Sequence, residues 1–481
     1  MDTDTLAQWT VTLKKVIFTV NIGFLAILLL QTALYVIQLV IAFFELRTHR
    51  ERLREGSTWW LLTNGLTLPI SILVPAYNEQ ATIVENIHSL LSLHYPDFEV
   101  IVINDGSKDK TLEEAVTNLG LKPIDRVYDL AVAHKQIRGI YGSPRYPRLI
   151  VVDKESGGKS DALNAGINLS RCPLFCAVDA DSVLDADALL RVVRPFIEAP
   201  EEMVAVGGRI RIVNGCTVRA GQVVEVKLPT QPLALFQSVE YIRAFLMARL
   251  AWSRLNAMLI ISGAFGVFKR SVALQVGGYT HGTVGEDMEI VTKIHRLLRD
   301  QKVNYQMRYV PDPVCWTESP VTLAVLRRQR SRWQRGMMET LSKHRAMIFS
   351  PKYGSVGILG LGNFFILDVL EPIMELAGLI IIPLCWALNI ISGQFLLAYI
   401  SLIFVFGVFI SVISLFLEEL SLAENPRPAD LLTLTLCAIA ENFGYRQINN
   451  LWRLEGIWQF LRKKQGWGAM TRTGFQKGKK T

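Results

Sequence analysis

Two long apolar regions enclose a more polar middle, and this pattern limits the folds open to the chain. The first apolar run extends from Val16 to Leu46 and carries no charged residue before Glu45. About 30 residues make a helix roughly 45 Å long, which crosses the hydrocarbon of a bilayer once but not twice. The run is too long for a cleaved signal peptide. We therefore predict a transmembrane helix at about residues 17–45, inside an N-terminal segment covering residues 1–56.

The second apolar region predicts a membrane block at residues 351–460. Half of all residues in the chain are hydrophobic, which is high for a soluble protein. The region divides into about four predicted helices, at residues 354–370, 373–391, 395–417 and 430–453. The first is the weakest because it contains Asn363 and Asp368. Leu431–Ala440 is too short to cross alone, so the polar stretch after it must join the last helix.

The distribution of basic residues orients these helices. Four arginines follow the first span: Arg47, Arg50, Arg52 and Arg54. Only Lys14 and Lys15 precede it closely, so the positive-inside bias places the middle of the chain in the cytosol. The tail at residues 461–481 is also basic and should be cytosolic, which requires an even number of crossings between the two. We predict five spans in all, in a multi-pass protein of the cell (inner or plasma) membrane.

The middle of the chain, residues 57–350, has the pattern of an α/β domain. Four short apolar runs alternate with helical patterns: Ile70–Pro75, Glu99–Ile103, Leu149–Val152 and Phe175–Val178. Continuous apolar strands separated by helices predict a mostly parallel, Rossmann-like sheet that is covered on both faces. The net charge of +8 suits an anionic membrane face or a diphosphate substrate. With the apolar runs, it predicts a lipid bilayer as partner and no nucleic acid.

A pair of aspartates closes the last of these strands. Asp179 and Asp181 are two apart in extended chain and therefore face the same way. Two carboxylates at the carboxyl end of a parallel strand lie where α/β sheets bind ligands. Hard oxygen ligands of this kind suit Mg²⁺ or Mn²⁺ bridging to phosphates. The same three-residue pattern also arises by chance in acidic turns.

Three further loops are predicted at the same edge of the sheet. Pro75, Tyr77 and Glu79 end the first strand, Asp105 follows the second, and Gly157-Gly158-Lys159 opens a helix. Tyr77 could stack on a base, Glu79 or Asp105 could hold ribose or base edges, and Lys159 could meet a diphosphate. Ordinary turns are the alternative interpretation.

The order of these motifs resembles that of the family 2 glycosyltransferases with a GT-A fold. The chain shows Asp105, Asp179-Ala180-Asp181, Gly285-Glu286-Asp287 and then Gln329-Arg330-Ser331-Arg332-Trp333. This is similar to the pattern of the processive synthases of cellulose, chitin, hyaluronan and poly-N-acetylglucosamine. The resemblance covers Ile70 to about Met347. Asn104 and Gly285 depart from it, in place of an aspartate and a threonine.

The resemblance implies that Asp287 is the general base for the acceptor hydroxyl, with Glu286 beside it in the catalytic motif. Inversion at the sugar C1 needs one carboxylate near the acceptor and away from the metal pair. A helix N-terminus favours the ionised form of Asp287. A simple N-capping aspartate is the alternative from the local sequence.

A predicted amphipathic helix at the membrane interface, residues 321–345, carries the last motif. Gln329, Arg332 and Trp333 share one face by their spacing. They offer an amide, a guanidinium for the diphosphate and an indole for a sugar ring. A basic helix lying on anionic lipid is a compatible alternative. Ser262 and Gly263 resemble the short motif that meets the acceptor end in these synthases.

Two features near the C-terminus bear on how the sugar chain could cross the membrane and how a tail could close over the nucleotide. Four polar residues repeat at helical spacing in the last predicted span: Asn442, Arg446, Asn449 and Arg453. Such a stripe indicates a sugar-conducting path or, alternatively, an interfacial helix emerging early into the cytosol. Gly466–Arg472 resembles the tail motif of hyaluronan and chitin synthases, with Arg472 near phosphate, although a disordered basic tail would also fit.

We therefore predict an inverting, processive β-glycosyltransferase that polymerises UDP-N-acetylglucosamine or UDP-glucose and helps to export the growing polysaccharide, its acceptor. A non-processive enzyme that moves one sugar onto a lipid is the alternative, and a membrane sensor that binds nucleotide sugar without turnover is a third reading. The sequence does not name the sugar or the linkage. It also leaves open whether accessory export subunits take part.

Overall fold

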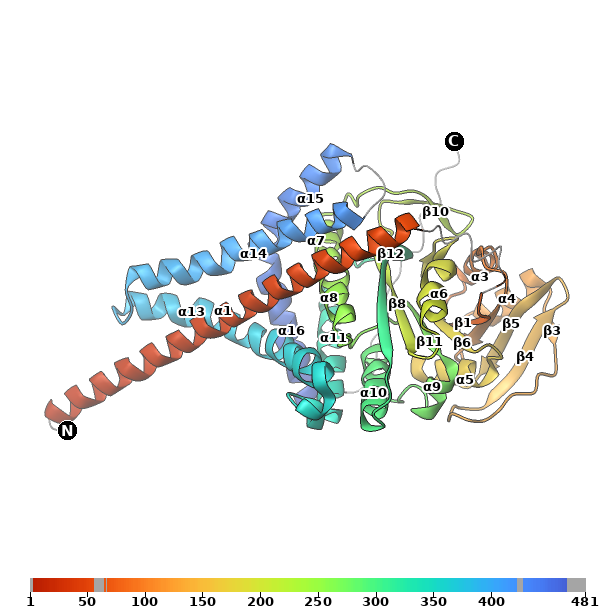
Figure 1. The fold of residues 1–481 in the computed structure, drawn as a ribbon, viewed down its shortest axis with the longest axis horizontal. Coiled ribbons are helices and arrows are strands. Elements are labelled where there is room, and N and C mark those ends of the chain that lie inside the picture. The colour runs from red at the N-terminus through yellow and green to blue at the C-terminus, as the bar shows by residue number, and fades with distance from the viewer. Residues whose placement is uncertain (1–2, 56–64, 66, 422–426, 465–481) are drawn as a thin grey trace.

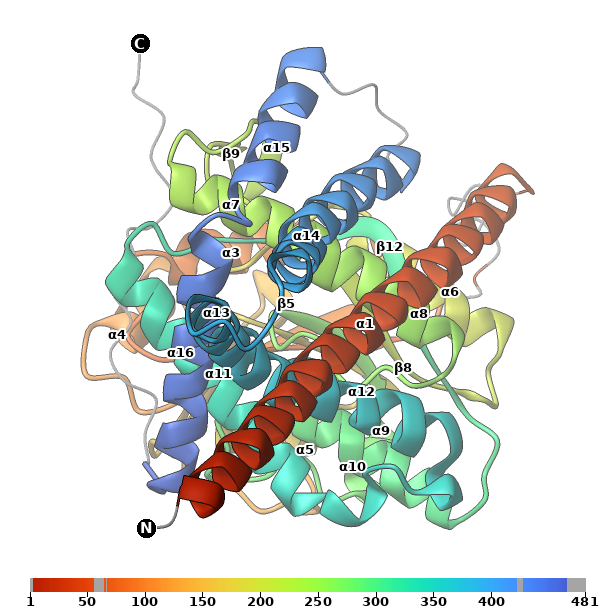
Figure 2. The ribbon, with the colours of Figure 1, turned by 90° about the vertical axis from the view of Figure 1, so that its left-hand side faces the viewer.

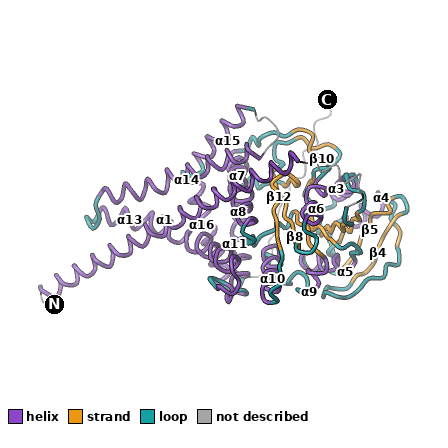
Figure 3. Tube along the Cα trace, viewed as in Figure 1, coloured by secondary structure: helices purple, strands orange, loops and turns teal. Residues whose placement is uncertain are grey.

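The computed structural model describes residues 3–55, 65, 67–421 and 427–464. Figure 1 shows an α/β unit at one end and a set of long helices that project from it. Figure 3 separates the two by secondary structure, with the strands gathered at one end and mostly helices at the other. The strands and the long helices thus occupy different parts of the molecule.

Within the described residues, the main sheet has ten strands in the order β3-β4-β5-β2-β1-β6-β11-β8-β12-β7. Their bounds are β1 Ile70–Ala76, β2 Phe98–Asn104, β3 Lys122–Pro123, β4 Ile137–Ser143, β5 Tyr146–Lys154, β6 Leu174–Val178, β7 Val183–Leu184, β8 Met203–Ile212, β11 Phe265–Lys269 and β12 Gln306–Thr317. β5, β2, β1 and β6 pair in parallel, while β11 is antiparallel to both β6 and β8. A two-stranded ribbon, β9 Thr217–Arg219 with β10 Gln222–Glu225, lies apart. All four predicted strands are confirmed.

Both faces of this sheet are buried, as the uninterrupted apolar strands predict. Along β1, Leu73 joins one hydrophobic core while Ile72 and Val74 join the other. Successive side chains of a strand point to opposite faces, so one strand must supply apolar residues at every position. Asp105 and Asp179 then follow the carboxyl ends of parallel strands β2 and β6, at a shared edge.

The helices of the α/β unit cover those two faces. Their bounds are α3 Ile83–Leu91, α4 Thr111–Leu119, α5 Lys159–Leu169, α6 Ala188–Glu198, α7 Pro232–Tyr241, α8 Ala248–Arg254, α9 Arg270–Gln275, α10 Glu286–Asp300 and α11 Leu323–Lys343. A π-helical turn, Ile242–Met247, joins α7 to α8, and short 3₁₀ turns occur at Arg345–Met347 and Pro351–Tyr353. α11 matches the predicted helix 321–345, and α5 begins at Lys159 as predicted.

The helical block consists of one N-terminal helix and a C-terminal set. Their bounds are α1 Thr3–Glu55, α12 Gly362–Phe364, α13 Glu371–Ala387, α14 Gly393–Ser421, α15 Pro428–Ala440 and α16 Tyr445–Leu461. Figure 2 shows α1 running obliquely beside α13 and α14, and α1 contacts both. Within the described residues, two helices are long and apolar enough to cross a membrane, at Lys14–Arg52 and Gly393–Glu419, and Pro428–Ala440 is a shorter apolar helix. The other predicted crossings stay predictions.

The predicted helix 430–453 is wrong as a single element. The helix is interrupted between α15 and α16 at Gly444, whose φ is +106°. Glycine adopts this conformation far more readily than other residues. α16 then packs along α11 of the α/β unit. The polar residues Arg446 and Arg453 therefore lie on a helix separate from the apolar one before them.

The predicted helix 354–370 is an irregular helical stretch. Two π-helical segments, Val356–Leu361 and Phe365–Leu370, flank α12 and lead directly into α13. Val356 and Val369 pack in one cluster with Met288 of α10 and Met337 of α11. This stretch thus covers the α/β unit, and its crossing of a membrane stays a prediction.

Candidate active site

The loop after β1 and the loop after β2 are bound to each other. The Asn78 amide donates to Ser107 Oγ at 3.0 Å, and the Lys108 amide donates to Asn78 Oδ1 at 2.9 Å. The Glu79 amide donates to Thr111 Oγ1 at 2.8 Å. Pro75 is half-buried at the end of β1, and Tyr77 is 46% exposed. Tyr77 is therefore accessible at this edge, as stacking on a base would require.

Asp105 is held by the loop that precedes α5. Its carboxylate accepts hydrogen bonds from the Gly157 and Gly158 amides at 2.9 and 2.7 Å. Lys154 Nζ lies 2.7 Å from Asp105 Oδ1 and also pairs with Asp161. Asp105 is only 4% exposed. Its carboxylate thus shapes the glycine loop, and direct contact with a nucleotide stays a prediction.

Lys154 is a site residue that the sequence analysis missed. Its side chain is fully buried between two carboxylates. Lys154 follows the apolar run Leu149–Val152 after one residue, Asp153. A lysine so close to a buried run needs an acid as partner, because an unpaired buried charge is strongly unfavourable. The strand order placed the Asp105 loop next to it.

Lys159 joins the two halves of the candidate site. Its ammonium lies 2.6 Å from Asp179 Oδ1 and 3.1 Å from Glu286 Oε1. It also donates to the Gly263 carbonyl at 3.2 Å. One side chain therefore contacts the strand-end aspartate, the acidic motif of α10 and the Ser262-Gly263 loop.

The charges around Lys159 keep it protonated. Burial acts to lower the pKa of Lys159, but Asp179 and Glu286 outweigh it and the pKa is raised. Burial raises the pKa of Glu286, although Lys159 beside it acts in the opposite direction. Desolvation disfavours a charge, and an opposite charge restores it. The cluster is therefore a tight ionic group at the edge of the sheet.

Asp179 and Asp181 fit a divalent cation only as part of a larger shell. The Asp179 side chain is 30% exposed, and Asp181 is half-buried. Within the described ranges, no group of three or more His, Cys, Asp or Glu side chains could hold a metal ion. Mg²⁺ commonly binds through one or two carboxylates and completes its shell with water and substrate phosphates. The two aspartates match that mode.

Asp287 lies in the first turn of α10. Gly285 is the residue that caps the helix, so the alternative of Asp287 as the N-cap is wrong. Asp287 Oδ1 accepts from the Met288 amide at 2.9 Å, and Oδ2 accepts from the Gly263 amide at 3.3 Å. Gly263 is thus held on both sides, with its amide donating to Asp287 and its carbonyl accepting from Lys159. Ser262 Oγ accepts from the Ala264 amide at 3.3 Å and fixes the same turn.

Gly285 packs backbone to backbone against Gly336 of α11. A Cβ on Gly285 would lie 2.9 Å from the Gly336 carbonyl carbon, and a Cβ on Gly336 would lie 2.7 Å from Gly285 Cα. Neither position has room for a side chain. The glycine in place of the usual threonine is therefore matched by a second glycine, which sequence analysis did not recognise.

Glu339, one turn further along α11, holds the loop that leads into α10. Its Oε2 accepts from Thr283 Oγ1 at 3.0 Å and from the Val284 amide at 3.1 Å. Lys343 pairs with Glu289 of α10 at 2.7 Å. α11 thus fixes the position of the first turn of α10, where Asp287 lies.

The middle of α11 carries the predicted acceptor face. Trp333 is 38% exposed, and the Arg330 guanidinium lies over its ring at 4.4 Å. Gln329 and Arg332 are half-buried. Trp333 therefore retains exposed aromatic surface for a ligand. Arg472 lies outside the described residues.

The arginines of the predicted polar stripe are engaged in ion pairs. Arg453 lies 3.0 Å from Glu371 and 2.9 Å from Asp368, and Arg446 lies 3.5 Å from Glu375. These pairs join α16 to the helical stretch that ends in α13. They fix α16 in place beside α11.

The fold, an α/β unit with a mostly parallel core sheet, is that of the GT-A glycosyltransferases. Residues 71–273 match the model of glycosyl transferase family 2, and residues 174–438 match that of glycosyl transferase family group 2. The chain therefore belongs to glycosyltransferase family 2, and it is an enzyme of that family.

Among curated relatives, the chain is 31% identical over 273 residues to a poly-beta-1,6-N-acetyl-D-glucosamine synthase of Staphylococcus epidermidis, covering 56% of this chain and 55% of the relative. It is 30% identical over the same length, with the same coverage, to synthases of that name from Staphylococcus aureus. The chain thus spans about half the length of the curated relatives it matches.

Among solved structures, the mannosyltransferase PcManGT from Pyrobaculum calidifontis, in complex with GDP-Man and Mn²⁺, is similar with a TM-score of 0.48 and 18% identity. That match covers 90% of this chain and 100% of the other. S. aureus TarS 1–349 in complex with UDP-GlcNAc is similar with a TM-score of 0.35 and 15% identity, covering 79% of this chain and 92% of the other.

Proposed function

We propose that the chain is a membrane-integrated, inverting and processive β-glycosyltransferase that polymerises a UDP-sugar, either UDP-N-acetylglucosamine or UDP-glucose. In this proposal residues 57–350 form the cytosolic catalytic domain, and the helices of residues 1–56 and 351–460 lie in or on the cell membrane. The observation that carries the proposal is the Lys159 cluster. It brings a donor-side carboxylate, an acceptor-side loop and a helix-borne acidic motif into one contact group.

The donor half would bind the nucleotide sugar at the carboxyl ends of β1, β2 and β6. Tyr77 would stack on the base, and Glu79 and Asp105 would face the nucleoside. A divalent cation held by Asp179 and Asp181 would neutralise the charge of the leaving diphosphate. Lys159, with Arg332, would meet the same diphosphate oxygens.

The acceptor half would carry out the proton transfer. The acceptor hydroxyl attacks C1 of the donor sugar in line with the bond to UDP. The new O–C1 bond forms, the C1–O bond to the diphosphate breaks, and Asp287 takes the hydroxyl proton. The Gly263 and Met288 amides orient the two oxygens of Asp287. Gln329 and Trp333 would hold the acceptor sugar.

The names of the staphylococcal relatives support a polymer as product, and the resemblance of the motif at Gln329–Trp333 supports processivity. The engaged arginines of α16 favour a second candidate, transfer of a single sugar onto a lipid acceptor. Arg446 and Arg453 are paired with acids of residues 368–375. These arginines are therefore less available to line a path for the sugar chain than the sequence pattern indicates.

Product length separates the two candidates. Membranes containing the chain would be incubated with a panel of radiolabelled UDP-sugars and Mg²⁺ or Mn²⁺, with UDP release measured in parallel. The proposal predicts one preferred donor and label in material of high polymer length. Label confined to organic-extractable material would instead establish single transfer, and UDP release at background with every donor would contradict both. Asp287→Asn supplies the matched inactive control.

A further inference from the structure

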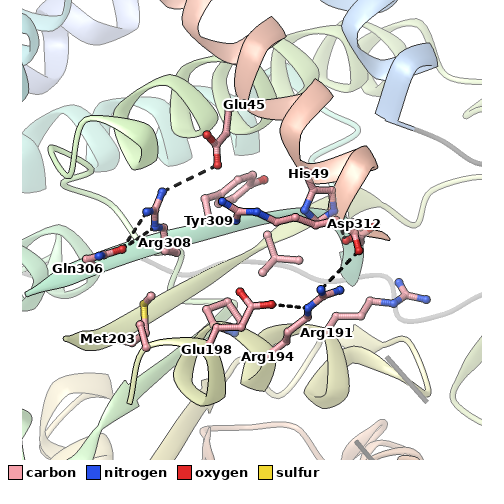
Figure 4. A pocket seen from close by; sticks show the side chains of 14 residues that line it. Glu45, His49, Arg191, Arg194, Glu198, Met203, Gln306, Arg308, Tyr309 and Asp312 are labelled. Atoms are coloured by element: carbon pink, nitrogen blue, oxygen red, sulfur yellow. Dashed lines mark hydrogen bonds and ion pairs between the residues drawn. The ribbon is translucent and has the colours of Figure 1, made fainter. Parts of the chain in front are cut away.

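A polar cavity of about 240 Å³ lies away from the proposed donor and acceptor residues. It opens between the C-terminal part of α1, helix α6 and strand β12 (Figure 4). None of the site residues discussed above lines it. The cavity thus belongs to the junction between the N-terminal helix and the α/β unit.

The lining of this cavity is rich in arginine. Four arginines from three elements take part: Arg52, Arg191, Arg194 and Arg308. Three carboxylates line it as well, and each lies close to a basic side chain. Asp312 lies 2.8 Å from His49, Glu198 lies 2.6 Å from Arg194, and Glu45 lies 3.3 Å from Arg254. Arg191 is paired with Asp185 at 3.2 Å, and Glu45 Oε2 is buried without a hydrogen-bond partner among the described residues. The four arginines of the lining still outnumber its three carboxylates.

Arg308 is only partly compensated. Its Nε and Nη2 donate to Gln306 Oε1 at 3.0 and 2.8 Å. Its Nη1 is buried and has no hydrogen-bond partner among the described residues, and its nearest acid, Glu45, is 3.9 Å away. Burial lowers the pKa of Arg308 by more than Glu45 restores, and Arg52 and Arg254 act in the same direction as burial. An anion in the cavity would favour the charged form of Arg308 and so oppose this lowering of its pKa.

The position of the cavity along α1 indicates which kind of molecule could supply such an anion. Glu45, His49 and Arg52 recur at helical spacing and share the face of α1 that lines the cavity. The apolar run of α1 ends at Leu46. If α1 crosses the bilayer as proposed, this face lies at the level of the lipid headgroups on the cytosolic side.

We propose that the cavity binds the phosphate of an anionic phospholipid headgroup and thereby fixes α1 to the catalytic domain. Arginine guanidinium groups recognise phosphate oxygens with paired hydrogen bonds. Arg308 and Arg194 approach from the domain side, and Arg52 approaches from α1. The proposal rests on the proposed membrane placement of α1, but not on the identity of the sugar or the product.

The test measures lipid binding by the full chain in detergent. Phosphatidylglycerol and phosphatidylcholine would be titrated separately, and binding read from the shift in thermal unfolding midpoint. The wild type should bind phosphatidylglycerol with preference. Arg308→Gln should weaken that binding roughly tenfold, the loss expected for one charge-assisted contact. Arg52→Gln, at an exposed position, should act in the same direction without disturbing the packing of β12.

Arg145→Gln is the matched control, because it removes an exposed arginine in the turn between β4 and β5 and should leave lipid binding unchanged. Equal phosphatidylglycerol binding by wild type, Arg308→Gln and Arg52→Gln would overturn the proposal. Glycerol phosphate or inorganic phosphate binding as tightly as the lipid would overturn the lipid source. Recovery of the chain in the soluble fraction without detergent would instead contradict the membrane placement itself.

Discussion

Two lysines five residues apart in the sequence make the same kind of contact and differ in what surrounds them. Lys154 lies between Asp105 and Asp161, and its side chain is 0% exposed. Lys159 lies between Asp179 and Glu286, and its side chain is 15% exposed. Each is a cation shared by two carboxylates, but one group is sealed and the other opens on the edge of the sheet.

The partners of the two lysines explain their different roles. Asp105 also accepts from two glycine amides, and Asp161 accepts from the Lys135 amide. Every member of the Lys154 group is therefore held by the fold. Asp179 is 30% exposed, so a ligand can reach it. We propose that the same ionic chemistry acts as scaffold where it is buried and as binding site where it is accessible.

Removing the sealed lysine should have the largest effect on the fold. Lys154→Met leaves two buried carboxylates without their cation, and breaking a buried ion pair costs about 3–5 kcal/mol. We expect a clear fall in the unfolding midpoint measured by thermal denaturation in detergent. Lys122→Met, at an exposed position on β3, is the control. A Lys154→Met chain as stable as the control would contradict the scaffold role.

Removing the accessible lysine should affect catalysis more than folding. Lys159→Met should lower transfer by about 100-fold, a loss typical of one charge-stabilising contact in a transition state, and should weaken UDP binding. Its unfolding midpoint should fall less than that of Lys154→Met, because water can reach Asp179. Isothermal titration with UDP and an assay of UDP release measure both. Sugar transfer at the wild-type rate in this variant would contradict the catalytic role of Lys159.

A methyl group between α10 and α11 should disturb the acceptor half alone. Gly336→Ala must push Gly285 away and shift the first turn of α10, and a displacement of about 1 Å can cost up to about 100-fold in rate. We expect kcat to fall at least several-fold while UDP affinity is unchanged. Gly23→Ala adds the same methyl to a helical glycine with open space around it and should have no effect. Equal losses of kcat and UDP affinity would show that the contact does not act through Asp287.

Truncation of Trp333 should give the smallest of these effects. Stacking of an aromatic ring contributes about 0.5–1.5 kcal/mol, so Trp333→Ala should shorten the product severalfold and spare UDP binding. Trp458→Ala is a close control, because Trp458 is also exposed and also lies under an arginine, Arg462 at 4.5 Å. Gel filtration of labelled product compares the two. Identical product lengths would remove Trp333 from the acceptor site.

Much of the fold was predictable because it depends on local pattern. The strands that precede Tyr77, Asp105 and Asp179 are continuous apolar runs, and a parallel sheet brings their carboxyl ends together. The start of α5 at Lys159 and the extent of α11 also follow from short-range signals. These features of the sequence predict which residues gather at the carboxyl edge of the sheet.

The remaining features depend on contacts between distant segments. Nothing near Gly285 in the sequence indicates that Gly336 lies against it, and the cavity at Arg308 forms only where α1 meets β12. The break at Gly444 had a local signal, since a glycine after an apolar helical run commonly ends a helix. The prediction of one helix there rests on the length that a membrane span requires.

The central claim is that the carboxylates divide the work: Asp179 and Asp181 hold the donor and Asp287 moves the proton. The most direct test measures UDP binding and sugar transfer on the same preparation of Asp287→Asn. The account predicts UDP affinity within about twofold of wild type and transfer reduced by about 100-fold or more, the range for loss of a general base. Transfer near the wild-type rate in that variant would contradict it.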